Sequence, residues 1–339
     1  MNAWAIARRA VSLAVVGLVL GAGPAAADAA KPGDYSSEVT AIEPDPGGFT
    51  IETTGGDAFL SLSVDEGTEV IVEGYQGEPY LRFNADGTVE RNLNSQATYI
   101  NDARFGGGDL IPDRLVGDAA ADLEPDWEQI ATNGAYAWHD HRTHLMTPDP
   151  PVDRGESFAW LGPVLLEVDG QPVTVTGEIT YHEAVSPLLW FALALLALVG
   201  LGVFGNRLPD RVPAVLVAVV GVLAAGVAWV GYTSLPSGAG ASIVPVVVAV
   251  VAVVLALVAA AVERLRMVGL LAAGVFLATW GVFRLAVLSN PVLPTDVPFA
   301  FERLVTALAL GVGVGAVVTA FRSGALTGAL MPLTDLAEE

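Results

Sequence analysis

Long apolar runs fill most of the second half of the chain, and each is long enough to cross a bilayer as a helix. Short loops that contain Arg, Gly and Pro separate them. The pattern predicts a five-helix transmembrane domain over residues 187–322 and a short tail over residues 323–339. The expected spans are residues 187–205, 213–232, 243–262, 267–288 and 301–321.

The preceding half alternates apolar and polar positions in short runs, which is typical of half-buried strands. Gly55-Gly56 and Asp169-Gly170 supply tight turns between such runs. About eight or nine strands with regular turns predict an all-β domain over residues 28–186, a sandwich or open barrel of the immunoglobulin-like type.

Residues 94–130 do not follow this alternation, and the segment is too long for a simple connection in a compact domain. It is therefore either functional or partly helical. Many Asp residues make calcium binding conceivable, but the segment lacks the D-x-[DN]-x-[DN]-G loop. A solvated acidic face is the favoured interpretation.

The N-terminus has the pattern of a secretory signal over residues 1–27. Arg8 and Arg9 precede an apolar run, and small residues follow as a cleavage site. An uncleaved helical anchor is the alternative, although the run is short for a bilayer of ~30 Å. The arginine pair leaves both general secretion and twin-arginine export open.

Charge divides the chain in the same way as hydropathy. The protein has 37 acidic and 16 basic residues, a net charge of -21, and 30 of the acidic residues lie between Asp28 and Ser186. So acidic a domain repels phosphates, which excludes nucleic acid as a partner. The chain has no Cys, so disulfides are excluded even in an oxidising compartment.

Loop arginines set the expected orientation, because cytoplasmic loops carry an excess of positive charge. This predicts a multi-pass protein of the cell membrane, with the β-domain outside and the C-terminus in the cytoplasm. The arginines on the predicted cytoplasmic side are Arg207, Arg211, Arg264, Arg266 and Arg322.

The predicted spans contain few polar side chains. Arg284 could pair with Glu302 as a polar cluster that joins the fourth and fifth spans. Alternatively, Arg284 could extend its head group to the membrane surface. Gly311 to Gly315, with sequence GVGVG, resembles a nucleotide loop superficially, but its place within a span favours close helix packing. No nucleotide cofactor is expected.

The stretch NGAYAWHDHRTHLM holds three of the four histidines, namely His139, His141 and His144. If residues 136–142 form a strand, His139 and His141 share one face and can converge on one ion. His144 would return from the following turn as a third ligand. Met146 adds a thioether, which shifts the expected preference from zinc, the alternative, toward copper.

Asp140 and Trp138 are candidates for the surroundings of this metal site, with Asp140 orienting an imidazole. The alternative is a satisfied polar network with Trp138 in the core. Catalysis is not favoured, because the motifs of nucleophilic hydrolases, phosphate-binding loops and zinc proteases are missing. A metal-dependent hydrolase is the enzymatic alternative.

With EPYLRF and YAWHDHRTHLM in its β-domain, the chain resembles a family of uncharacterised actinobacterial membrane proteins that have this architecture. It is also loosely similar to exported copper-resistance β-sandwiches of the CopC and YcnI types. That likeness implies a surface copper site, although the histidines here cluster in one segment. Two functions follow as hypotheses. One is a membrane-anchored copper-binding protein for capture, sensing or transfer. The other is a non-enzymatic envelope interaction or structural module that contacts another exported or membrane protein.

Overall fold

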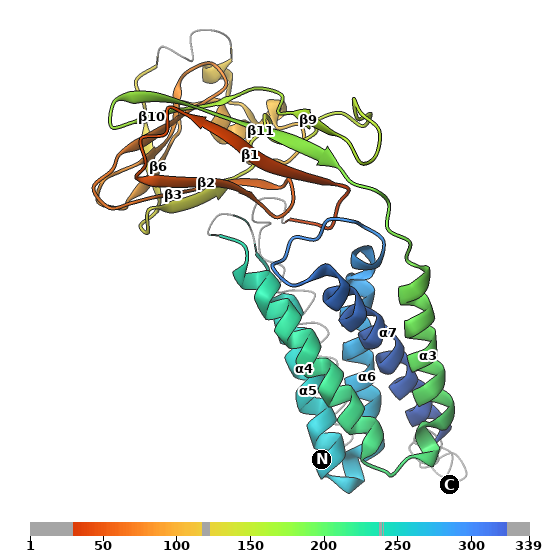
Figure 1. The fold of residues 1–339 in the computed structure, drawn as a ribbon. Coiled ribbons are helices and arrows are strands. Elements are labelled where there is room, and N and C mark those ends of the chain that lie inside the picture. Colours follow the sequence, from red (N-terminus) through yellow and green to blue (C-terminus); the bar gives the residue numbers. More distant parts are fainter. Residues whose placement is uncertain (1–29, 117–122, 237–238, 240, 324–339) are drawn as a thin grey trace.

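The structure, a computed structural model, describes residues 30–116, 123–236, 239 and 241–323. An open antiparallel β-domain sits at one end of a bundle of five long helices (Figure 1). This confirms the predicted fold class. The predicted signal peptide, residues 1–27, and residues 324–339 of the predicted tail lie outside the described residues.

Two antiparallel sheets make up the described part of the β-domain. The larger has the order β1-β11-β10-β4-β5-β6-β7, with β9 also paired to β11, and the smaller has the order β2-β3-β8. The strands are β1 (Tyr35–Glu43), β2 (Phe49–Thr54), β3 (Phe59–Val64), β4 (Val70–Glu73), β5 (Pro79–Phe83), β6 (Val89–Asn92), β7 (Trp127–Ala131), β8 (Ala135–Trp138), β9 (Ser157–Ala159), β10 (Val164–Val168) and β11 (Gln171–Tyr181).

One hydrophobic core joins the two sheets. Leu60 and Leu62 of β3 are fully buried against residues of the larger sheet, such as Val72 and Leu81. Strand β10 shows the expected period of two, because its residues are alternately buried and exposed. The arrangement is sandwich-like, with inward side chains from both sheets filling the space between them.

Two segments differ from the expectation. Strand β8 ends at Trp138, so the alternation predicted through Arg142 does not extend to the histidines. The described part of residues 94–130 is partly helical, with α2 (Ala97–Ile100), 3₁₀ turns at Gly108–Leu110 and Asp113–Leu115, and most of the unforeseen strand β7. The prediction that this segment is partly helical agrees with the structure.

The second half forms helices α3 (Leu188–Phe204), α4 (Val212–Thr233), α5 (Val244–Ala261), α6 (Arg266–Phe283) and α7 (Phe299–Arg322). Within the described residues, five helices are long and apolar enough to cross a membrane. The chain is therefore a multi-pass membrane protein. The fourth span ends as an α-helix at Phe283 and continues as a 3₁₀ turn over Leu285–Leu288.

Small residues let α7 pack closely on its neighbours (Figure 1). A Cβ atom added at Gly311 would lie 2.2 Å from the carbonyl oxygen of Ala194 in α3. A Cβ atom at Gly313 would lie 2.5 Å from the backbone nitrogen of Ala278 in α6. The GVGVG stretch is thus a packing feature, since only glycine permits these approaches.

The β-domain contacts the bundle through both backbone and side chains. Gly33 and Val292 exchange two backbone hydrogen bonds, of 3.0 and 3.1 Å. Beside them, Phe59 of β3 and Ala137 of β8 form a small apolar cluster with residues that include Leu235. Leu235 follows α4, so the start of β3 and the adjacent end of β8, which the histidine segment follows, lie over the membrane bundle.

Candidate functional site

The histidine segment begins where β8 ends, beside β3. Leu60 and Trp138 are paired across these two strands. Asp140 then ends the strand with a turn, because its Oδ1 accepts the backbone N–H of Arg142 at 3.1 Å and its carbonyl accepts that of Thr143 at 3.0 Å. His139 and His141 therefore do not share one face of a strand.

Asp140 is fully buried and accepts hydrogen bonds from Arg142 and Trp138. Its carboxylate accepts hydrogen bonds from Arg142 Nε and Nη2, each at 2.8 Å, and from the Trp138 indole at 3.0 Å. Burial alone would raise the pKa of Asp140, but the Arg142 guanidinium and these hydrogen bonds hold it below its ordinary value. The carboxylate is thus an internal anion paired with an internal cation.

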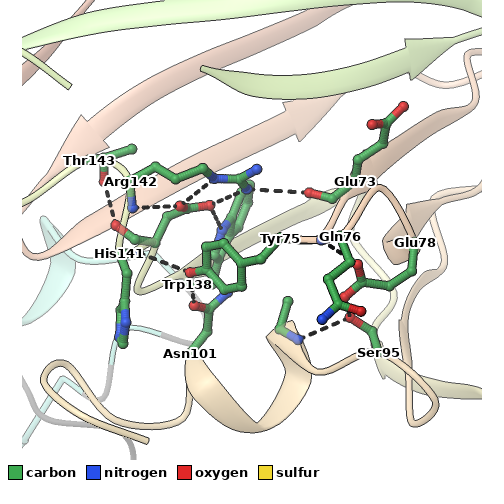
Figure 2. Close-up of polar contacts among 12 residues, drawn as sticks. Glu73, Tyr75, Gln76, Glu78, Ser95, Asn101, Trp138, His141, Arg142 and Thr143 are labelled. Carbon is green, nitrogen blue, oxygen red and sulfur yellow. Dashed lines mark hydrogen bonds and ion pairs between the residues drawn. The ribbon is translucent and has the colours of Figure 1, made fainter. Parts of the chain in front are cut away.

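Tyr75 connects this ion pair to the neighbouring loop (Figure 2). Its ring lies 5.0 Å from the Arg142 guanidinium, and its hydroxyl accepts the backbone N–H of His141 at 3.0 Å. The same hydroxyl donates to the side-chain oxygen of Asn101. Burial and the nearby Asp140 raise the pKa of Tyr75, so the hydroxyl keeps its proton.

His139 is buried against the turn between β2 and β3. Its ring stacks on Phe59 with centroids 4.3 Å apart, and its Nδ1 lies 2.5 Å from the carbonyl oxygen of Ala58. A carbonyl can only accept, so Nδ1 carries the proton and donates. The ring therefore links β8 to the turn that contacts the bundle.

His141 is half-buried and bonds to a different segment. Its Nε2 donates to the carbonyl oxygen of Ala103 at 2.9 Å. Next to that carbonyl, Arg104 forms a salt bridge of 2.5 Å with the buried Asp57, which lies in the β2–β3 turn. These contacts fasten the loop after α2 to the same turn that His139 holds.

His144 is fully buried, with its ring 5.4 Å from that of His141 and 5.6 Å from that of Phe105. Its Nε2 is buried without a hydrogen-bond partner. Burial, the positive charge of Arg104 and the nearby His141 lower the pKa of His144 to about 3. The imidazole is therefore neutral throughout the physiological range.

The structure thus brings two of the four suspected ligands into direct ring contact, His141 and His144. His139 lies near them on the β3 side, and Met146 is half-buried two residues beyond His144. Among the residues that the structure describes, no group of three or more His, Cys, Asp or Glu side chains is placed to hold a metal ion. A convergent three-histidine arrangement is not preformed.

Sequence reasoning missed Tyr75, Asp57 and Arg104, which surround the histidine segment. They lie far from it along the chain, so no spacing motif could include them. A local signal did exist for the turn. Asp140 followed by Thr143 is a pattern typical of turns that interrupt strands.

The second candidate site lies in the bundle. Arg284, which follows α6, donates a hydrogen bond to Glu302 in the first turn of α7, and the two form a salt bridge. Glu302 is 1% exposed. The structure therefore has Arg284 paired with Glu302, the first of the two predicted arrangements, and not extended to the membrane surface.

Compared with known protein families, curated proteins and solved structures, this chain matches none. The resemblances to the actinobacterial membrane family and to the copper-resistance β-sandwiches stay predictions.

Proposed function

We propose that this protein is a non-enzymatic envelope module whose β-domain, anchored by the membrane bundle, binds another exported or membrane protein. In this proposal the histidine segment is internal scaffolding. The observation that supports it is that His139 and His141 donate their ring N–H groups to the carbonyls of Ala58 and Ala103. Both rings are thereby engaged in holding distant segments of the domain together.

The surface that this scaffold supports is the described part of the segment after Arg104, residues 105–116 and 123. Large apolar side chains are exposed there, and such exposure is typical of interaction sites when the side chains gather. The contacts of His141 and Arg104 fix the beginning of that segment to the domain. The exposed apolar residues of this segment are Phe105, Leu110, Val116 and Leu123.

We place the β-domain outside the cell and the C-terminus in the cytoplasm. The support is the one-sided distribution of loop arginines. In the structure, Arg207 and Arg264 lie near the bundle end opposite the β-domain, since they follow α3 and α5. Export of the chain by the N-terminal signal belongs to the same proposal.

A copper-binding function is the second candidate, and one observation favours it. His141 and His144 are in ring contact, and the buried Nε2 of His144 has no hydrogen-bond partner. Two imidazoles with a thioether at Met146 close by in sequence would suit Cu(I) better than zinc. A third histidine ligand would have to move to bind the ion, because no group of three or more His, Cys, Asp or Glu side chains is placed to hold a metal among the described residues.

Metal titration of the full-length protein in detergent separates the two functions. If the histidines are scaffolding, Cu(I), Cu(II) and Zn(II) show no saturable binding near one equivalent. His139→Ala and His141→Ala should then each lower the melting temperature by about 2–4 °C with or without metal, as expected for the loss of about 1 kcal/mol per hydrogen bond. His182→Ala, at the end of β11, is the control for histidine loss elsewhere in the domain.

The opposite result would assign the copper function. It consists of one bound Cu(I) that raises the melting temperature and is lost in both His141→Ala and His144→Leu. Met146→Leu should then weaken Cu(I) binding and leave Cu(II) binding nearly unchanged.

A further inference from the structure

A cavity of about 190 Å³ lies at the end of the bundle that faces the β-domain, where α4 and α6 end and α5 begins. An apolar cavity of about 150 Å³ can hold a benzene ring, so this cavity has room for several carbon atoms. The helices and the turn after α6 contribute Ala228, Gly231, Tyr232, Pro245, Phe283 and Val287 to its walls.

The walls of this cavity are mostly apolar. The two charged side chains among the lining residues, Arg284 and Glu302, form a salt bridge with each other, and Arg284 Nε and Glu302 Oε2 are buried. The pair therefore asks for no charged ligand. A water molecule in a cavity needs about two to four polar partners, whereas carbon atoms gain dispersion contacts with apolar walls. The cavity thus favours a hydrocarbon group.

The rim of the cavity joins the surface of the bundle that faces lipid. Phe283 lines the cavity and is 81% exposed. Trp229 and Val282, which follow and precede the lining residues Ala228 and Phe283 in the chain, are also exposed. These helices are long and apolar enough to span a membrane, so their exposed apolar side chains contact lipid chains. The molecule beside the opening is therefore a membrane lipid.

The cavity also adjoins the joint between the bundle and the β-domain. Ala30 and Pro32 line it, and the next residue, Gly33, exchanges two backbone hydrogen bonds with Val292. A group that fills the cavity would therefore pack against the bundle and against the segment that leads into β1.

We propose that this cavity binds one acyl chain of a phospholipid from the leaflet on the β-domain side of the membrane. The chain enters beside Phe283, and its middle part packs against Ala228 and Val287. The headgroup stays at the membrane surface. The bound chain contributes to the contact between the bundle and the β-domain.

Photo-cross-linking in vesicles tests this proposal. The full-length protein is reconstituted into phosphatidylcholine that includes a phosphatidylcholine with a diazirine halfway along one acyl chain. Ala228 lies five residues before the end of α4, about 8 Å into the membrane at about 1.5 Å per residue, which is close to the depth of the middle of a chain. After illumination, mass spectrometry locates the labelled residues, which are those that the chain contacts.

Two pairs of neighbouring residues make this measurement specific to the cavity. Ala228 and Val287 line the cavity, whereas Val227 and Leu288 do not, and all four are at most 4% exposed. Lipid around the bundle therefore does not reach any of them. We expect labels on Ala228 and Val287 and none on Val227 and Leu288. The exposed Trp229 should be labelled by the surrounding lipid in every sample.

A cavity-filling variant tests the location without changing the ion pair. A Cβ atom at Gly231 would meet only the Thr295 hydroxyl, at 3.8 Å, so Gly231→Leu fits the helix and extends into the cavity. Gly226→Leu is the matched control, because Gly226 lies in the same helix with open space around it. Gly231→Leu should abolish the labels on Ala228 and Val287, and Gly226→Leu should retain them.

Each result decides the question. Labels on Ala228 and Val287 that disappear in Gly231→Leu support the acyl chain. Equal labelling of Val227 and Leu288 would show that lipid enters the bundle at any position, which overturns the site. Labels that persist in Gly231→Leu overturn it too. If Trp229 is labelled and Ala228 and Val287 are not, the cavity holds no acyl chain.

Discussion

His144 makes the β-domain sensitive to acid, and His144→Leu should remove that sensitivity. In the folded protein the pKa of His144 is lowered to about 3, whereas it is ~6.5 in the unfolded chain. Between these two values the unfolded state binds a proton that the folded state rejects. The contribution of neutral His144 to the free energy of unfolding is therefore fully present above pH 6.5, and it is lost progressively as the pH falls toward 3.

The expected slope follows from the size of this window. Each pH unit between 6.5 and 3 costs about 1.4 kcal/mol, so the step from pH 6.5 to 4.5 costs about 2.7 kcal/mol. For a domain of this size, that loss corresponds to a fall of about 5–11 °C in melting temperature. Leucine has a similar size and no buried nitrogen without a partner, so His144→Leu should be nearly neutral at pH 7.5.

Melting of the full-length protein in detergent, followed by tryptophan fluorescence at pH 7.5, 6.5, 5.5 and 4.5, measures this effect. The wild type should lose stability over the last two steps, from pH 6.5 to 4.5, and the difference between wild type and His144→Leu isolates the contribution of this histidine from that of the acidic residues. His182→Gln is the control and should retain the acid sensitivity. Parallel curves for wild type and His144→Leu would refute the buried neutral state of His144.

Two further predictions concern the ion pair and the orientation. Asp140→Ala leaves Arg142 buried without its anion and should destabilise the domain by about 3–5 kcal/mol. The double variant Asp140→Ala/Arg142→Ala should lose much less stability than the sum of the losses in the two single variants. Melting shifts that add fully would contradict direct coupling between the two side chains. Cysteine at Glu66 should react with an impermeant thiol reagent on intact cells, whereas cysteine at Ser323 should not. Labelling at Ser323 alone would reverse the proposed topology.

The sheet strands could be predicted from the sequence wherever one face of the strand is buried. Val164–Val168 alternates buried and exposed side chains, so its pattern carries the information. Trp127–Ala131 has no fully buried residue and lies at the edge of its sheet. Since its pairing is specified by the backbone of β6 and not by core packing, the pattern of its side chains did not reveal it.

The histidine segment shows a different limit of sequence reasoning. A period of two places His139 and His141 together only if the strand continues past Trp138. Asp140 prevents this, because its carboxylate binds the backbone N–H and the guanidinium of Arg142. The hydrogen bonds of the Asp140 side chain therefore replace continued strand pairing, and the two imidazoles point in different directions. Each imidazole donates to a backbone carbonyl more than thirty residues away in sequence.

Buried polar atoms without partners occur in both halves of the chain, but their surroundings differ. His144 Nε2 lies among the rings of His141 and Phe105 on a neutral imidazole, and leaving this nitrogen unmet costs about 1–3 kcal/mol. Arg284 and Glu302 are charged and form a salt bridge with each other inside the bundle. Leaving a buried charge unmet costs more than leaving a neutral nitrogen unmet.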